Sequence, residues 1–158
     1  MKGLGRATGC TLLLAAALAP QASAQQILHA PDEIRACLCR EQAVSTLAGA
    51  VKEARETYEE RQKEVQSLAQ RADEARRRLD AANLADREAF AQLLGSRDVA
   101  SDRFAADVVP HYNAVVRRYD AAATAFNQDC AGKAYDPVVL PQVRASLSCP
   151  PVAMREQG

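Results

Sequence analysis

Residues 44–82 read VSTLAGAVKEARETYEERQKEVQSLAQRADEARRRLDAA, and this stretch decides the fold. Small or apolar residues recur here at alternating steps of three and four, with Arg61 as the single polar break. That spacing places them along one side of an α-helix, as a seam for a partner helix. The seam consists of Val44, Leu47, Val51, Ala54, Tyr58, Val65, Leu68, Ala72, Ala75, Leu79 and Ala82.

The residues between the seam positions are mostly charged, and opposite charges recur four positions apart. Residues four apart are neighbours on a helix surface, so such pairs support an exposed helix face. We interpret this face as solvated rather than as a binding patch. The pairs are Lys52 with Glu56, Glu59 with Lys63, Asp73 with Arg77, and Glu74 with Arg78.

A second seam follows in the next helical region, again in steps of three and four. Its aromatic residues recur every seven positions, a spacing that favours packing against another helix over a ligand site. Within this region Pro110 is expected to kink the helix, because proline lacks a backbone donor and clashes with the preceding turn. The seam consists of Val108, Tyr112, Val115, Tyr119, Ala122 and Phe126.

Two places could form the turn between the seams, one near Asn83 and one at Gly95. A turn near Asn83 gives two arms of about 45 residues each, from Cys39 to the turn and back to Cys130, so that the cysteine-bearing ends meet. A turn at Gly95 would leave the arms unequal. We therefore predict an antiparallel, coiled-coil-like helical hairpin that turns at 83–86, with Asp86 as a helix cap.

The N-terminus predicts export. Lys2 and Arg6 precede a short apolar run, and small residues at Ala22 and Ala24 precede a polar start. This is the pattern of a signal peptide over residues 1–24, cleaved after Ala24. We expect residues 25–158 to form a single helical-hairpin domain with a C-terminal tail, located in the periplasm or secreted, with no transmembrane segment after cleavage.

Composition narrows the classes of partner. Basic and acidic residues are equal in number, and removal of Lys2 and Arg6 leaves a small excess of acid. Nucleic acid requires a basic face, so a nucleic-acid partner is not expected. The chain has no tryptophan and few aromatic residues, which favours thin helical layers over a wide core. We expect the partner to be another protein, or a second copy joined through helix faces.

Four cysteines remain after the signal: Cys37, Cys39, Cys130 and Cys149. In an oxidising compartment they predict two disulfides, with three connectivities. Residues two apart on a helix face opposite sides, so Cys37 and Cys39 are expected to bond different partners. We favour Cys37 with Cys130, because Cys37 lies seven residues before Val44 on the seam, and Cys39 with Cys149. The opposite pairing stays open.

The C-terminal tail is expected to return over the cysteine-bearing end of the hairpin. Gly132 offers a turn, and a short helix is expected to start at Asp136 and Pro137. Its apolar residues would cover the closed end: Val139, Leu140, Val143 and Leu147.

Other chemistries are less well supported. A zinc site of the four cysteines lacks paired C-x-x-C spacing, and a redox pair at Cys37 and Cys39 lacks a thioredoxin-like context. His29, expected in a mobile leader, and His111 are the only histidines. No catalytic triad or phosphate loop is recognisable. We expect no enzyme activity, metal or cofactor.

Four segments carry a resemblance: CLC at 37–39, HYNAVVRRYD at 111–120, FNQDCAGKAYD at 126–136 and QVRASLSCPP at 142–151. The chain resembles an uncharacterised family of small exported bacterial helical proteins with a CLC motif and two further C-terminal cysteines. The resemblance implies the same helical architecture and supplies no catalytic residues.

The functional hypotheses follow from this architecture. The first is a non-enzymatic envelope protein that acts as a coiled-coil scaffold or docks a partner helix. The alternative is a client-binding chaperone, similar to periplasmic holdases in size, export signal and helical arms, although those proteins are basic and carry a strand-forming body. The third is a thiol redox or metal-binding protein.

Overall fold

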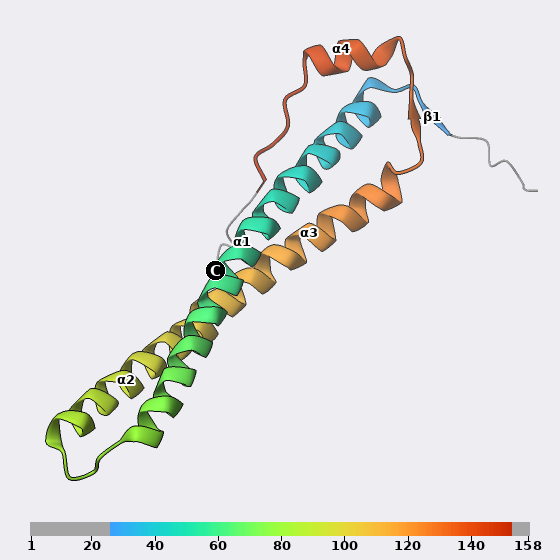
Figure 1. Ribbon diagram of the computed structural model, residues 1–158. Coiled ribbons are helices and arrows are strands. Elements are labelled where there is room, and N and C mark those ends of the chain that lie inside the picture. The colour runs from blue at the N-terminus through green and yellow to red at the C-terminus, as the bar shows by residue number, and fades with distance from the viewer. Residues whose placement is uncertain (1–25, 153–158) are drawn as a thin grey trace, which may run out of the picture.

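The structure is a computed structural model that describes residues 26–152, and it shows a long antiparallel hairpin of helices closed at one end (Figure 1). The first arm is α1, Pro31–Arg78. The second arm consists of α2, Leu84–Arg103, then a π-helix, η1, Phe104–Val108, and then α3, Val109–Asp129. The predicted all-α hairpin is confirmed. The expected signal peptide, residues 1–24, lies outside the described residues.

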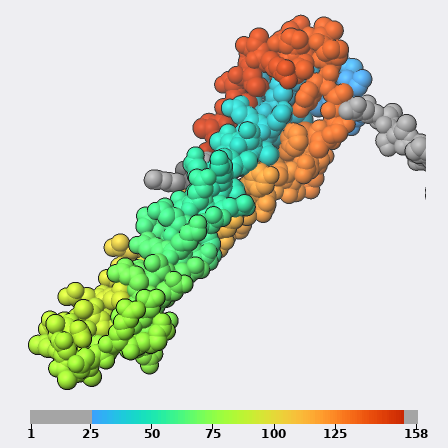
Figure 2. Space-filling view, in the orientation of Figure 1, coloured from blue at the N-terminus to red at the C-terminus, as the bar shows by residue number. Residues whose placement is uncertain are grey.

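The molecule is a rod that is thicker at its closed end (Figure 2). α1 contains 48 residues, which corresponds to a length of about 72 Å. The helix begins at Pro31, where proline fits the first turn, and Asp32 and Glu33 complement the positive end of the helix dipole. The arm was expected to run from Cys39 to the turn, and the helix extends about two turns further toward the N-terminus.

The turn between the arms lies at residues 79–83, slightly earlier than the predicted 83–86. Asn83, rather than Asp86, caps α2: its Oδ1 accepts hydrogen bonds from the backbone N–H of Ala85 at 3.0 Å and of Asp86 at 3.5 Å. Asp80 Oδ1 accepts from the N–H of Ala82 at 2.9 Å. Two side chains thus satisfy backbone donors that the turn leaves free, and the prediction of Asp86 as the cap was wrong.

The predicted seam of α1 faces the second arm. Leu47, Ala54 and Ala72 are buried, the polar break Arg61 is exposed, and Ala82 lies in the exposed turn. The remaining seam residues of α1 are partly buried, while the charged residues between them lie outside. Of the four predicted i, i+4 ion pairs within the described chain, Lys52–Glu56 is within range, at 4.0 Å.

The π-helix marks the middle of the second arm. It ends just before Pro110, which occupies the first turn of α3, where a missing N–H costs no intrahelical bond. The π-helical segment therefore lies just before Pro110, and the kink expected at this proline stays a prediction. Opposite it, the ring of Tyr58 packs against Phe104 at 5.0 Å and Tyr112 at 5.3 Å between ring centroids. The aromatic residues of the second seam thus contribute to packing, as expected.

The closed end contains a feature that the sequence did not predict. β1, Ile27–Leu28, pairs in parallel with β2, Ala134–Tyr135, and the short helix α4, Val139–Ala145, follows (Figure 1). The predicted tail helix is present, and its apolar residues do cover the closed end. The core there comprises Leu28, Ile34, Cys37, Leu38, Cys130 and Val143, with Phe126, Tyr135, Val139, Leu140 and Leu147 packed against it.

Candidate functional site

The four cysteines singled out from the sequence come together at the closed end. Cys37 is bonded to Cys130, with Cα atoms 5.5 Å apart, and Cys39 to Cys149, at 5.3 Å. These are the pairs expected from the sequence. One bridge ties α1 to the end of α3 and the other ties it to the returning tail. Every one of these sulfurs is bonded to another sulfur, so none is a thiolate that could bind zinc or attack a disulfide.

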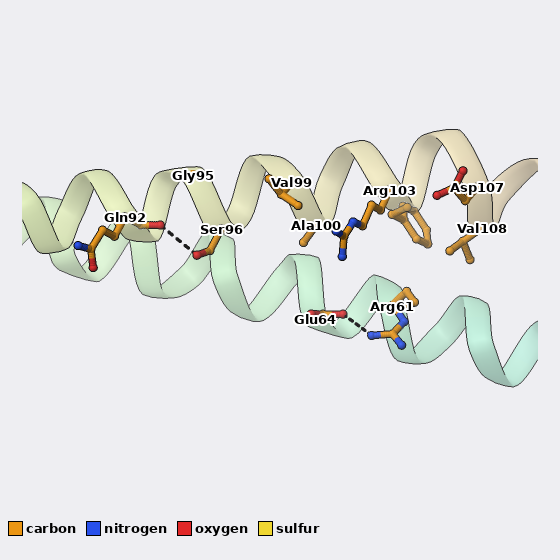
Figure 3. Close-up of a pocket in the computed structure, with 11 residues that line it drawn as sticks. Arg61, Glu64, Gln92, Gly95, Ser96, Val99, Ala100, Arg103, Asp107 and Val108 are labelled. Carbon is orange, nitrogen blue, oxygen red and sulfur yellow. Dashed lines mark hydrogen bonds and ion pairs between the residues drawn. The ribbon is translucent and has the colours of Figure 1, made fainter.

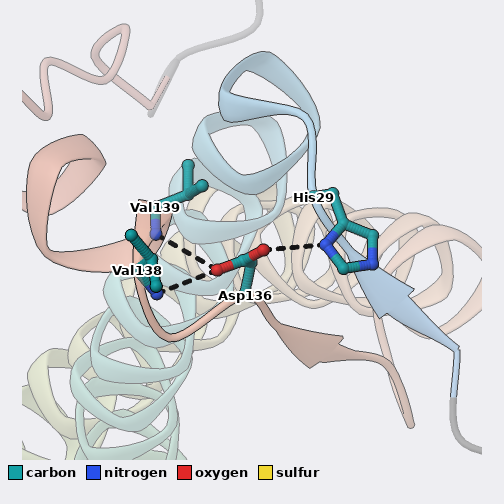
Figure 4. A network of polar contacts seen from close by, with 4 residues as sticks. All are labelled: His29, Asp136, Val138 and Val139. Atoms are coloured by element: carbon teal, nitrogen blue, oxygen red, sulfur yellow. Dashed lines mark hydrogen bonds and ion pairs between the residues drawn. The ribbon is translucent and has the colours of Figure 1, made fainter.

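A polar contact joins the N-terminal strand to the tail at this end (Figure 4). The Nδ1 atom of His29 lies 2.8 Å from Asp136 Oδ2, while Asp136 Oδ1 accepts from the N–H of Val138 at 2.8 Å and of Val139 at 3.3 Å. The hydrogen bond from His29, followed by that from Val138, lowers the pKa of Asp136. His29 is thus placed by β1 and this contact, and not in the mobile leader that we expected.

In the described part of the chain, the other residues that could take part in catalysis or metal binding do not lie close together. His111 is exposed on α3, far along the chain from His29. Across residues 26–152, no three side chains of His, Cys, Asp or Glu gather closely enough to hold a metal ion. A membrane-crossing helix is likewise not found in this part of the chain, since none of its helices is both long and apolar enough.

A hollow lies between α1 and the second arm, beside the π-helix (Figure 3). We call it the mid-hairpin groove, and its volume is about 800 Å³. Its α1 side carries a charged pair, and its opposite side is formed by α2 and η1. The lining residues are Arg61, Glu64, Gln92, Gly95, Ser96, Val99, Ala100, Arg103, Phe104, Asp107 and Val108.

The groove exists because the seam is interrupted on both sides. On α1, the position that the heptad spacing assigns to a core residue is Arg61, whose long polar side chain stays exposed. Further along the groove, toward the tip of the hairpin, α2 contributes Gly95, where an added methyl group would meet no atom within 4 Å (Figure 3). The exposed side chain of Arg61 at a core position and the missing side chain at Gly95 both leave the seam unfilled, and the nearby π-helix shifts the phase of the second arm.

The charges of the groove are mixed. Arg61 donates a hydrogen bond from a guanidinium nitrogen to Glu64 Oε2 at 2.9 Å. That bond, with the nearby charge of Glu60, raises the pKa of Arg61, so the guanidinium stays protonated. Arg103 and Asp107 lie one turn apart on the opposite side. The lining of the groove therefore combines two cations and two anions with the apolar side chains of Val99 and Phe104.

No protein-family model, curated protein or solved structure matched this chain. The candidate site therefore rests on its own geometry. Its lining combines exposed charged residues with the apolar side chains of Val99 and Phe104, a mixture that is also found in protein–protein interfaces. Sequence reasoning did not identify the groove, although Arg61, the single polar break of the seam, marked its position.

Proposed function

We propose that this chain is a non-enzymatic exported protein that serves as a rigid helical scaffold and docks a protein partner through the mid-hairpin groove. One contrast carries the proposal: two disulfides and a small core close one end, while α2 contains no buried residue. A helix that buries nothing completely within its own chain retains apolar surface for another chain.

Export is supported by the two disulfides, which are compatible with an exported protein. Structural disulfides persist in oxidising compartments such as the periplasm and the extracellular space. The signal pattern of residues 1–24 points to the same destination. Both features support a location in the cell envelope or outside the cell.

Docking is supported by the apolar side chains that the distal arm leaves in solvent. Leu84 is 59% exposed and Val99 is 51% exposed, and Val99 lines the mid-hairpin groove. Phe104, at the far end of the same groove, is partly buried against Tyr58 and remains accessible. A partner that inserts apolar side chains between these residues would cover surface that the two-helix seam cannot cover alone.

Photo-crosslinking in living cells tests this function. A photoreactive residue would replace Val99 in the groove or, as the matched control, Val138, a valine at the closed end that is 72% exposed. We expect one discrete crosslinked product from position 99 and none from position 138. A smear of many unlike proteins from both positions would contradict specific docking and favour the holdase alternative.

The export part of the proposal has its own measurement. N-terminal sequencing of the protein recovered from the envelope or the medium should begin at Gln25. A recovered chain that still contains Leu12–Leu18 would contradict cleavage of the signal peptide and release from the membrane.

A further inference from the structure

We propose that the partner of the mid-hairpin groove is a second copy of this chain, with the two grooves facing each other across a two-fold axis. The inference rests on the docking function proposed above and names its occupant. The shape of the groove, its charges and its extent all fit a second copy.

On the α2 side of the groove, the exposed side chain of Val99 lies next to the open space at Gly95, which we call the receiving space. Val99 is 51% exposed, and Gly95, four residues earlier, faces open space, since an added methyl group would meet no atom within 4 Å. Residues four apart lie on the same face of a helix. In a dimer with two-fold symmetry, the same surface of both copies forms the interface. Each copy must therefore supply both the inserted side chain and the space that receives it. Val99 of each copy can therefore enter the space above Gly95 of the other.

The charges of the groove are also self-complementary. Arg61 and Arg103 supply two positive charges, while Glu64 and Asp107 supply two negative ones. A groove of a single sign would repel its own copy, whereas a neutral groove of mixed signs can pair with a rotated version of itself. The same neutrality gives no preference for a strongly charged partner such as nucleic acid or an anionic lipid surface.

The surface around the groove is long enough for a reversible dimer. A second hollow, of about 520 Å³, lies nearer the tip of the hairpin; it is lined by Arg71, Ala75 and Arg78 of α1 and adds Asp86 of α2, so the charges stay mixed along the whole face. These α1 residues continue the steps of three and four from Arg61 and Glu64, so both hollows lie on one face. From residue 61 to 78 this face is about 26 Å long, and two helices of about 10 Å diameter give roughly 500 Å² per copy.

That area predicts the strength of the association. A standard stable interface buries about 800 Å² per partner, so a face of roughly 500 Å² indicates a weaker, reversible dimer. We expect a dissociation constant on the order of micromolar, which ordinary protein concentrations in solution can resolve.

Sedimentation of the purified, disulfide-bonded protein from about 1 µM to 1 mM tests the inference. We expect a monomer–dimer equilibrium. Gly95→Gln should fill the receiving space and weaken dimerisation at least about tenfold, while raising the thermal midpoint of the monomer because glutamine is a better helix former than glycine. Val99→Ala should also weaken the dimer, whereas the matched control Val138→Ala, at the closed end, should leave it unchanged.

The outcomes separate this inference from the proposed function. A monomer at every concentration would overturn the second copy as the occupant, and a dimer that neither Gly95→Gln nor Val99→Ala weakens would overturn the assigned face. If the protein is monomeric but position 99 crosslinks to one unlike protein in cells, the inference fails and the docking function stands. A smear of unlike clients in cells, with a dimer in the centrifuge, would reject the docking function and leave the self-association established.

Discussion

Ile34, at the closed end, has no exposed surface, whereas α2, at the other end of the same hairpin, contains no buried residue. The closed end adds β1, β2 and α4 to the two arms, so side chains there are covered from more than two directions. In the distal half only α1 and α2 meet. Two helices in contact leave each other's flanks in solvent, which is why that half keeps a hollowed face.

This difference supports separate roles for the two halves: stability at the closed end and, as proposed above, docking in the distal half. The two disulfides close loops of 93 and 110 residues in sequence separation, so they restrict the unfolded chain as a whole, although both lie at one end. The stability supplied there lets the distal half stay thinly packed. A thinly packed segment is also one that opens locally at low cost, and binding surfaces are often drawn from such segments.

Removal of a disulfide should cause the largest loss in the free energy of unfolding. Replacing Cys37 and Cys130 together by alanine should lower the free energy of unfolding by about 4–5 kcal/mol, because the bridge closes a loop of more than ninety residues. Urea unfolding followed by circular dichroism measures the change. The pair Cys39→Ala with Cys149→Ala is the matched variant and should cost a similar amount. A loss below about 1 kcal/mol for both pairs would show that the closed end is not where stability resides.

Truncation of one side chain at each end compares the two ends directly. Ile34→Ala should destabilise by about 3 kcal/mol, since it empties a fully enclosed position in the core. Leu84→Ala, at the exposed start of α2, should change stability by less than about 0.5 kcal/mol. Thermal unfolding of both variants at equal protein concentration measures the difference. Equal losses would erase the proposed contrast between the ends.

A charge placed in the seam tests whether the distal half is packed at all. Leu68→Asp should destabilise by about 2 kcal/mol, because Leu68 is partly buried on the side of α1 that faces the second arm. Glu59→Ala, on the exposed side of the same helix, is the control and should cost less than about 0.5 kcal/mol. If the control costs as much as the seam variant, the faces of α1 are assigned wrongly.

The smallest predicted effect is a change in the pH dependence of stability, and it arises from a carboxyl group at the closed end. The folded protein lowers the pKa of Asp136 through its bonds with His29 and Val138. A depressed carboxyl pKa contributes stability above the unfolded value, and that contribution is lost as pH falls through the folded value. Asp136→Asn should therefore flatten the acidic limb of the stability curve, below about pH 4. If urea titrations of this variant give an unchanged acidic limb, Asp136 does not contribute to the pH dependence of stability.

Much of the hairpin could be predicted because its signals are local in sequence. The steps of three and four from Val44 identify the seam without knowledge of the partner helix, and equal arm lengths place the turn within a few residues of its position. The cap was misassigned because Asn83 and Asp86 are both suitable residue types, and the choice between them depends on where the turn ends. The helical residues of α1 that precede Cys37 were not expected, because the arms were measured between their cysteine-bearing ends.

The other features of the structure depend on contacts that no local sequence pattern predicts. The strands at Ile27–Leu28 and Ala134–Tyr135 are two residues long and more than a hundred positions apart, too short to show alternation. The π-helix shifts the phase of the second arm against α1, and the mid-hairpin groove lies beside this shift. Arg61 could have signalled the groove, but Gly95 becomes informative only when the two positions are known to face the same hollow.

Amide hydrogen exchange tests the central claim most directly, because it reports the stability of each segment in one measurement. The disulfide-bonded protein would be studied at a concentration low enough to be monomeric. We predict that backbone amides of α1 near Ile34 and Cys37 exchange at least about 100-fold more slowly than those in the middle of α2, since the closed end opens only with the whole molecule. Equal protection along α1 and α2 would contradict the account, because the hairpin would then open as a single unit and the distal half would not be separately mobile.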